Sequence, residues 1–101
     1  MTGVDTVYRR LRLADDLVVT WDRHLLTVAT SRWEPGTFVY DVEFLAVGGK
    51  HTRNGGTKVA LGGLGAHFRF HVLRFELDAA QFAEFDALIT QVRAYRDERL
   101  S

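Results

Sequence analysis

The sequence contains two histidines four residues apart, His67 and His71. Histidine is the side chain that most often binds a metal ion. Phe68 and Phe70 alternate with them, which favours a strand, where residues four apart are separated by about 13 Å. That distance is too long for two ligands of one zinc ion, since each bond is only about 2 Å long. We therefore expect solvent-facing histidines and no metal site.

The side chains needed for nucleophilic catalysis are also missing from the sequence. The only serines are Ser31 and Ser101, neither lies in a G-x-S-x-G turn, and the chain has no cysteine. The glycine-rich stretch does not match the phosphate-binding pattern G-x-x-x-x-G-K-[ST], because Lys50 is followed by His51. The adjacent Asp15 and Asp16 fit a turn better than a catalytic pair. The sequence thus predicts a protein that is not an enzyme and uses no cofactor.

One group of basic side chains does offer a binding site. The group surrounds the pairs Gly48-Gly49 and Gly55-Gly56 and consists of Lys50, His51, Arg53 and Lys58. Backbone N–H groups of a glycine-rich loop, together with cations, can receive a phosphate or a carboxylate. The candidate ligands are an anion, a lipid headgroup or an acidic partner. The alternative is a solvated hairpin tip with no ligand.

The elements that position these residues are mostly strands. Residues 17–30 predict a hairpin, because two β-branched runs flank a tight reversal at Asp22-Arg23-His24. Residues 38–44 predict a half-buried strand, since their aromatic and aliphatic residues recur at every second position. Phe68, Phe70 and Val72 alternate in one parity and Leu73, Phe75 and Leu77 in the other, which predicts a bulge near His71-Val72.

Seven of the nine glycines fall in residues 48–65. Glycine is typical of turns and loops, so this stretch predicts a hairpin loop at 48–57 and a second turn at 62–65. Between them, a short strand is expected around Thr57 to Leu61.

The last element is a helix over residues 79–97. Its apolar residues recur three and four apart, which is the helical period, and they are Phe82, Phe85, Leu88, Ile89, Val92 and Tyr95. Asp78 is expected to cap the helix, with Gln81 completing a capping box and Leu77 and Phe82 forming a hydrophobic staple.

The opposite side of this helix carries four alanines, Ala80, Ala83, Ala87 and Ala94. A small and nearly uncharged helix face can pack closely against another helix, so these residues are a candidate self-association face. Alanine also has the highest helix propensity, which explains the same residues without a partner.

The composition limits the class of protein. The chain has 101 residues, 47% of them hydrophobic and 26% charged, which fits a single globular domain, 1–101, with strands over about 7–77. Thirteen basic residues balance thirteen acidic ones, so a nucleic-acid partner is not expected. No apolar run approaches the roughly 18 residues of a membrane span, and Met1–Asp5 shows no signal sequence. These features favour a cytoplasmic protein.

The order of elements resembles the bacterial pleckstrin-homology-like (PH-like) domains. Short antiparallel strands end in one capped helix, and Leu73-Arg74-Phe75-Glu76-Leu77-Asp78 lead directly into it. The resemblance implies two crossed sheets whose open end is closed by Phe82, Phe85, Ile89 and Val92. It also implies a scaffold for protein contacts or self-assembly.

The expected fold is therefore α+β, mostly β, with antiparallel sheets forming a small barrel or sandwich and one C-terminal amphipathic helix packed on it. The expected function is a non-enzymatic protein-interaction or self-assembly module, such as a bacterial homo-oligomeric structural subunit. The alternative is a small-ligand or anion-binding domain that uses the basic glycine-rich loop 48–58.

Overall fold

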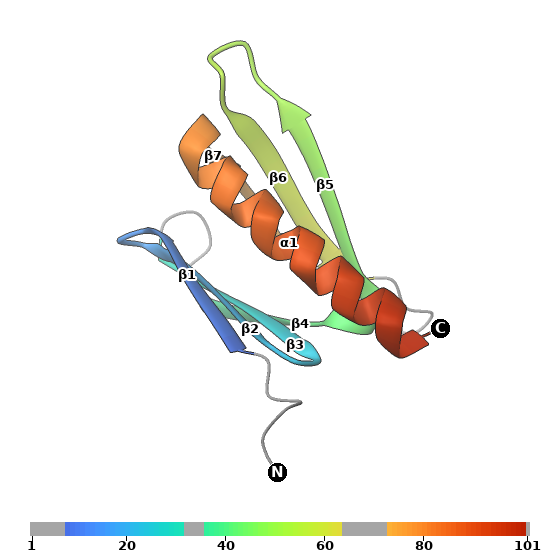
Figure 1. The fold of residues 1–101 in the computed structure, drawn as a ribbon. Coiled ribbons are helices and arrows are strands. Elements are labelled where there is room, and N and C mark those ends of the chain that lie inside the picture. Colours follow the sequence, from blue (N-terminus) through green and yellow to red (C-terminus); the bar gives the residue numbers. More distant parts are fainter. Residues whose placement is uncertain (1–7, 32–35, 64–72, 101) are drawn as a thin grey trace.

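The computed structural model describes residues 8–31, 36–63 and 73–100, with the side chains of the last two left out. This part of the chain forms two antiparallel sheets and a C-terminal helix (Figure 1). The first sheet has the order β1-β2-β3-β4, with strands Tyr8–Ala14, Leu17–Asp22, Leu25–Thr30 and Gly36–Asp41. The second has the order β5-β6-β7, with strands Leu45–His51, Thr57–Gly63 and Leu73–Leu77. The helix, α1, is Ala79–Leu100.

The predicted fold class is confirmed: the chain is α+β and mostly strand, with one C-terminal helix. Of the two arrangements expected, the sheets pack as a sandwich and do not close into a barrel. The predicted hairpin over 17–30 is also confirmed as β2 and β3, joined by Arg23 and His24. Arg23 has a φ of 48°, and its carbonyl accepts a hydrogen bond from Trp21 Nε1 at 2.9 Å, which holds the tight reversal in place.

Helix α1 begins where the capping residues predict. The Asp78 carboxylate accepts from the Gln81 backbone N–H at 2.8 Å, and Gln81 Oε1 accepts from the Asp78 N–H at 2.9 Å. Gln81 also donates to the Leu13 carbonyl at 2.9 Å, which ties the first helical turn to β1. Two of the first turn's orphan N–H donors are satisfied in this way, and the start of the helix is fixed to the first sheet.

The core lies where α1 meets both sheets. On the helix it contains Phe85, Leu88, Ile89 and Val92, all buried. The Phe85 ring lies edge-on to Phe75 of β7, with ring centroids 5.7 Å apart. Tyr95 lies edge-on to Trp21 of β2, also at 5.7 Å. Because α1 packs its aromatic side chains on both sheets, it holds the two layers together.

The strand predicted over 38–44 ends earlier than expected. Strand β4 stops at Asp41, and Val42–Phe44 form a 3₁₀ turn. The Asp41 carboxylate accepts from the Glu43 N–H at 2.9 Å, so this side chain caps the turn and competes with a continued strand. Tyr40 and Val42 are still buried, but Phe44 is 44% exposed.

The loop predicted at 48–57 is shorter than expected, because Gly48 and Gly49 lie inside β5 opposite Ala60 and Val59. The turn covers only Thr52 to Gly56, where Gly55 has a φ of +82° and Gly56 donates to Thr52 Oγ1. Strand β6 contains the predicted strand at 57–61 and extends through Gly62 and Gly63. The predicted bulge at His71-Val72 and both candidate metal histidines lie outside the described residues. In the described part of the chain, no helix is long and apolar enough to cross a membrane.

Candidate functional site

The outer face of the second sheet, which points away from the core, brings basic side chains together. Lys50 of β5 lies directly opposite Lys58 of β6, and Lys58 lies opposite Glu76 of β7. One row further along, Ala60 lies between Gly48 and Arg74. Because side chains alternate along a strand, these residues share one face, while Val59, Leu61, Phe75 and their neighbours of the other parity are buried.

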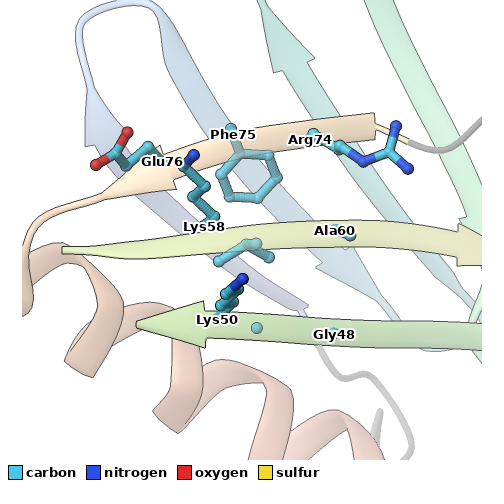
Figure 2. Close-up of a pocket in the computed structure, with 9 residues that line it drawn as sticks. Gly48, Lys50, Lys58, Ala60, Arg74, Phe75 and Glu76 are labelled. Carbon is cyan, nitrogen blue, oxygen red and sulfur yellow. The ribbon is translucent and has the colours of Figure 1, made fainter. Parts of the chain in front are cut away.

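This outer face is hollowed. An open hollow of about 570 Å³ lies over the three strands and is lined by Gly48, Gly49, Lys50, Lys58, Val59, Ala60, Arg74, Phe75 and Glu76. Figure 2 shows Lys50, Lys58 and Glu76 on neighbouring strands, with Arg74 further along β7. A Cβ atom added at Gly48 would meet nothing within 4 Å. The hollow exists because two of the three positions in the row next to Lys50, Lys58 and Glu76 are small residues, Gly48 and Ala60, with Arg74 as the third.

The charges on the outer face do not cancel. Lys50, Lys58 and Arg74 are positive and exposed, against the single carboxylate of Glu76. Among the described residues, none of these four side chains forms an ion pair. Like charges directly opposite each other on two strands are destabilising, and Lys50 and Lys58 form such a pair. In a chain with no net charge, this local excess of positive charge favours an anionic ligand.

The structure separates the four basic residues that the sequence grouped. Lys50 and Lys58 belong to the outer face, but His51 lies on the opposite side of β5. There its Nδ1 is hydrogen bonded to Thr57 Oγ1 at 3.0 Å, and its ring lies 6.0 Å from that of Phe82. Arg53 is exposed in the turn after β5. Arg74 replaces these two in the basic group, and the sequence gives no signal of this because it does not reveal which residue of β7 pairs with Ala60.

The four alanines of the candidate self-association face are all exposed on α1. Their side of the helix is opposite the buried residues Phe85, Leu88, Ile89 and Val92. At the borders of this face, the exposed charged residues are Glu84, Asp86, Arg93, Asp97 and Glu98. Four of these five are acidic, so the alanine face is a small-residue surface with acidic borders.

A smaller cleft separates β5 from α1. It has a volume of about 210 Å³ and is lined by Val47, Gly48, Gly49, His51, Thr57, Phe82, Phe85, Asp86, Ile89 and Arg93. Gly49 lies on the helix side of β5 and has no side chain, so the backbone of the strand is exposed at this position. Within the part of the chain that the structure describes, no three His, Cys, Asp or Glu side chains are grouped to hold a metal ion.

Comparisons with known proteins give no relative from which a role could be inferred. No family model, no curated protein and no solved structure matches the chain. The chemistry of the outer face, the alanine face and the cleft is therefore the basis for a functional proposal.

Proposed function

We propose that this protein is a non-enzymatic protein-interaction domain of PH-like type that binds an acidic segment of a partner protein on the outer face of its second sheet. The observation that carries this proposal is the cross-strand register that gathers Lys50, Lys58 and Arg74 around one hollow. None of these cations has a partner among the described side chains, so binding of carboxylates does not require an internal ion pair to break.

The spread of the charges favours an extended acidic segment over one small anion. Lys50 and Arg74 lie two strands apart, which is about 10 Å, and one row apart along the strands. A segment with several carboxylates can contact all three cations at once. The small residues Gly48 and Ala60 in the row of Arg74 allow the backbone of that segment to come close to the sheet.

The arrangement of the elements supports the PH-like assignment. The resemblance implies two sheets and one C-terminal helix that packs on them, and two antiparallel sheets followed by such a helix fit that expectation. The proposal includes the finer expectations from the sequence: a bacterial protein in the cytoplasm that acts as a homo-oligomeric structural subunit.

A small-ligand or anion-binding domain remains the second candidate. The observation in its favour is the direct pairing of Lys50 with Lys58, because two neighbouring ammonium groups can hold one phosphate. Inorganic phosphate would then bind as well as an acidic peptide does, and loss of Arg74 would have little effect on either ligand.

The test is a titration with a short oligoglutamate peptide at low salt, in which calorimetry measures the binding affinity. We expect the triple variant Lys50→Ser, Lys58→Ser, Arg74→Ser to lose binding. The matched control removes the same charge from the first sheet, as Arg9→Ser, Arg10→Ser, Arg12→Ser, and should bind like the parent. Binding should also weaken as salt is added, because exposed charges are screened beyond about 8 Å at physiological ionic strength.

The control also defines the result that would overturn the proposal. Equal losses in both triple variants would mean that the peptide responds only to net charge. Unchanged binding in the Lys50, Lys58 and Arg74 variant would remove the outer face as the site. Equal affinity for inorganic phosphate would favour the small-anion function instead.

A further inference from the structure

Strand β5 is an edge strand whose second side is unpaired in the described part of the chain. The Thr52 N–H donates to the Gly56 carbonyl at 2.9 Å, which makes these two residues a hydrogen-bonded pair. Such pairs alternate along an antiparallel ladder, so the N–H and C=O groups of residues 46, 48 and 50 point toward β6. Those of Leu45, Val47, Gly49 and His51 point to the free side. Consistent with this, the Leu45 carbonyl accepts a hydrogen bond from Arg96 Nη1 of α1 at 3.3 Å.

The free edge of β5 has few of the features that usually protect an edge strand. Natural edges are blocked by bulges, prolines, clustered charges or short length. Strand β1, an edge of the first sheet, has a register shift between Arg12 and Ala14 and also contains Arg9 and Arg10. Strand β5 pairs without a register shift over seven residues, and its only lysine is Lys50, near one end. The edge is therefore regular and open to another strand.

The contact between β5 and α1 leaves a cleft. This 210 Å³ cleft is lined on the strand side by Val47, Gly48, Gly49, His51 and Thr57, so β5 is not tightly covered by the helix there. Neither glycine has a φ in the left-handed region, so both have ordinary strand geometry. In Figure 1, β5 forms the border of the second sheet, and none of the described strands covers it on that side.

We propose that two copies of this chain pair through β5, antiparallel, about a two-fold axis at Gly48. Hydrogen-bonded pairs must join residues that point to the free side. Four residues of β5 point to that side, and an axis at Gly48 pairs all of them. Val47 then pairs with Gly49 of the other copy, and Leu45 pairs with His51. An axis at Val47 or at Gly49 leaves one of the four without a pair.

The side chains fit this register. Val47 faces Gly49 of the second copy, so a larger side chain meets a position without one. Lys50 faces Ala46, which keeps the two lysines of the dimer from lying opposite each other, where like charges would destabilise the pair. The two central pairs do not involve Leu45, whose carbonyl is already bonded to Arg96, and at two bonds per pair they supply about four hydrogen bonds. This self-complementarity favours a second copy over an unrelated strand.

Pairing about Gly48 joins the two second sheets into one. The outer faces of both copies then lie on the same side, because the two-fold axis is perpendicular to the sheet. Two basic hollows would share a continuous surface whose centre is formed by small residues. The dimer goes beyond the proposed binding function and does not depend on it, because each copy carries a complete outer face.

The test is a single cysteine in a chain that has none. An axis at Gly48 makes Gly48 and its symmetry mate a non-hydrogen-bonded pair, with Cα atoms about 4.5 Å apart, which is within the range that a disulfide spans. We expect Gly48→Cys to form a disulfide-linked dimer in air. The control, Ala60→Cys, places the thiol on the same outer face, one strand away from the edge, and should remain a reduced monomer on a non-reducing gel.

Sedimentation provides the second measurement. Gly49→Pro removes an N–H that points to the free edge, without removing one from the ladder with β6, and a Cβ at this position meets Thr57 Cγ2 at an ordinary 3.5 Å. We expect the dimer dissociation constant to rise by about a hundredfold, since two hydrogen bonds are lost per dimer.

Three results would overturn the β5 dimer. The first is a parent that sediments as a monomer, together with a Gly48→Cys variant that cross-links no faster than Ala60→Cys. The second is a dimer that is unaffected by Gly49→Pro and does not cross-link through Gly48→Cys, which would place the contact elsewhere. The third is cross-linking at Ala60→Cys to the same extent as at Gly48→Cys, which would indicate random collision.

Discussion

The outer face of the second sheet and the alanine face of α1 are both made of small residues bordered by charges, but the charges have opposite sign. On the sheet, Gly48 and Ala60 share a row with Arg74, next to the row of Lys50 and Lys58. On the helix, the exposed alanines are bordered by four carboxylates and one guanidinium group, that of Arg93. Small residues allow close approach on either surface. The sign of the bordering charge therefore decides which kind of partner each surface can bind.

Charge also distinguishes the alanine face from the edge of β5 as sites of self-association. Two alanine faces packed on each other would bring acidic borders together, at an energetic cost that rises as water is excluded. The helix face thus remains a predicted self-association surface with an unfavourable charge pattern. The edge of β5 has no such repulsion in the register proposed, because its one lysine faces an alanine.

The largest expected effect comes from the inner side of α1, on which both surfaces depend. Phe85 is 1% exposed and contacts Phe75 of β7. We expect Phe85→Ala to lower the free energy of unfolding by about 3 to 5 kcal/mol, through lost burial and the cavity left behind. Denaturant unfolding measures this. The matched control is Phe44→Ala at a position that is 44% exposed, where we expect a loss of about 1 kcal/mol or less.

A Phe85→Ala variant as stable as the Phe44→Ala control would show that α1 does not pack on the core. In that case the two sheets would need another source of cohesion. The outward position of the alanine face would also lose its basis, because that face is defined by the residues buried opposite it.

A smaller effect is expected when the same substitution is made on each surface in turn. Ala60→Glu places a carboxylate among the three cations of the outer face, and we expect oligoglutamate to bind about tenfold more weakly, a change of about 1.4 kcal/mol. Ala87→Glu adds the same charge to the helix, and we expect unchanged peptide affinity, unchanged sedimentation and stability within about 0.5 kcal/mol.

Two outcomes would remove the contrast between the surfaces. If Ala87→Glu weakened peptide binding as much as Ala60→Glu, the peptide would respond to net charge and not to the outer face. If Ala87→Glu converted a dimer into a monomer, the helix face would be the self-association surface, and the β5 dimer would be wrong.

The elements that the sequence predicts well are those specified by neighbouring residues. The start of α1 follows from Asp78 and Gln81, which form their capping box within four residues. The hairpin over 17–30 follows from two alternating runs and a reversal between them. The end of β4 was missed, because the Asp41 side chain caps a turn that the alternation of residues 38–44 does not reveal.

The candidate site could be predicted only in part. Lys50 and Lys58 are brought together by a hairpin between two adjacent strands, so the sequence was enough to group them. The place of Arg74 depends on the register between β6 and β7, which pairs Ala60 with Arg74. Register is fixed where one face of a sheet is buried, and no local sequence signal reveals it here. The sequence predicts a loop at Gly48 and Gly49, because glycine has no side chain and cannot contribute to the alternation that indicates a strand. In the structure both residues belong to β5 and line the hollow.

The most direct test of the basic outer face is a map of which backbone amides respond to the acidic peptide. In a two-dimensional NMR titration with oligoglutamate, we expect the largest shifts at Gly48–Lys50, Lys58–Ala60 and Arg74–Glu76. The amides of β1 from Arg9 to Arg12, which carry as many positive charges on the other sheet, should move little. Shifts centred on β1, or an even response of all exposed basic residues, would contradict a binding site on the second sheet.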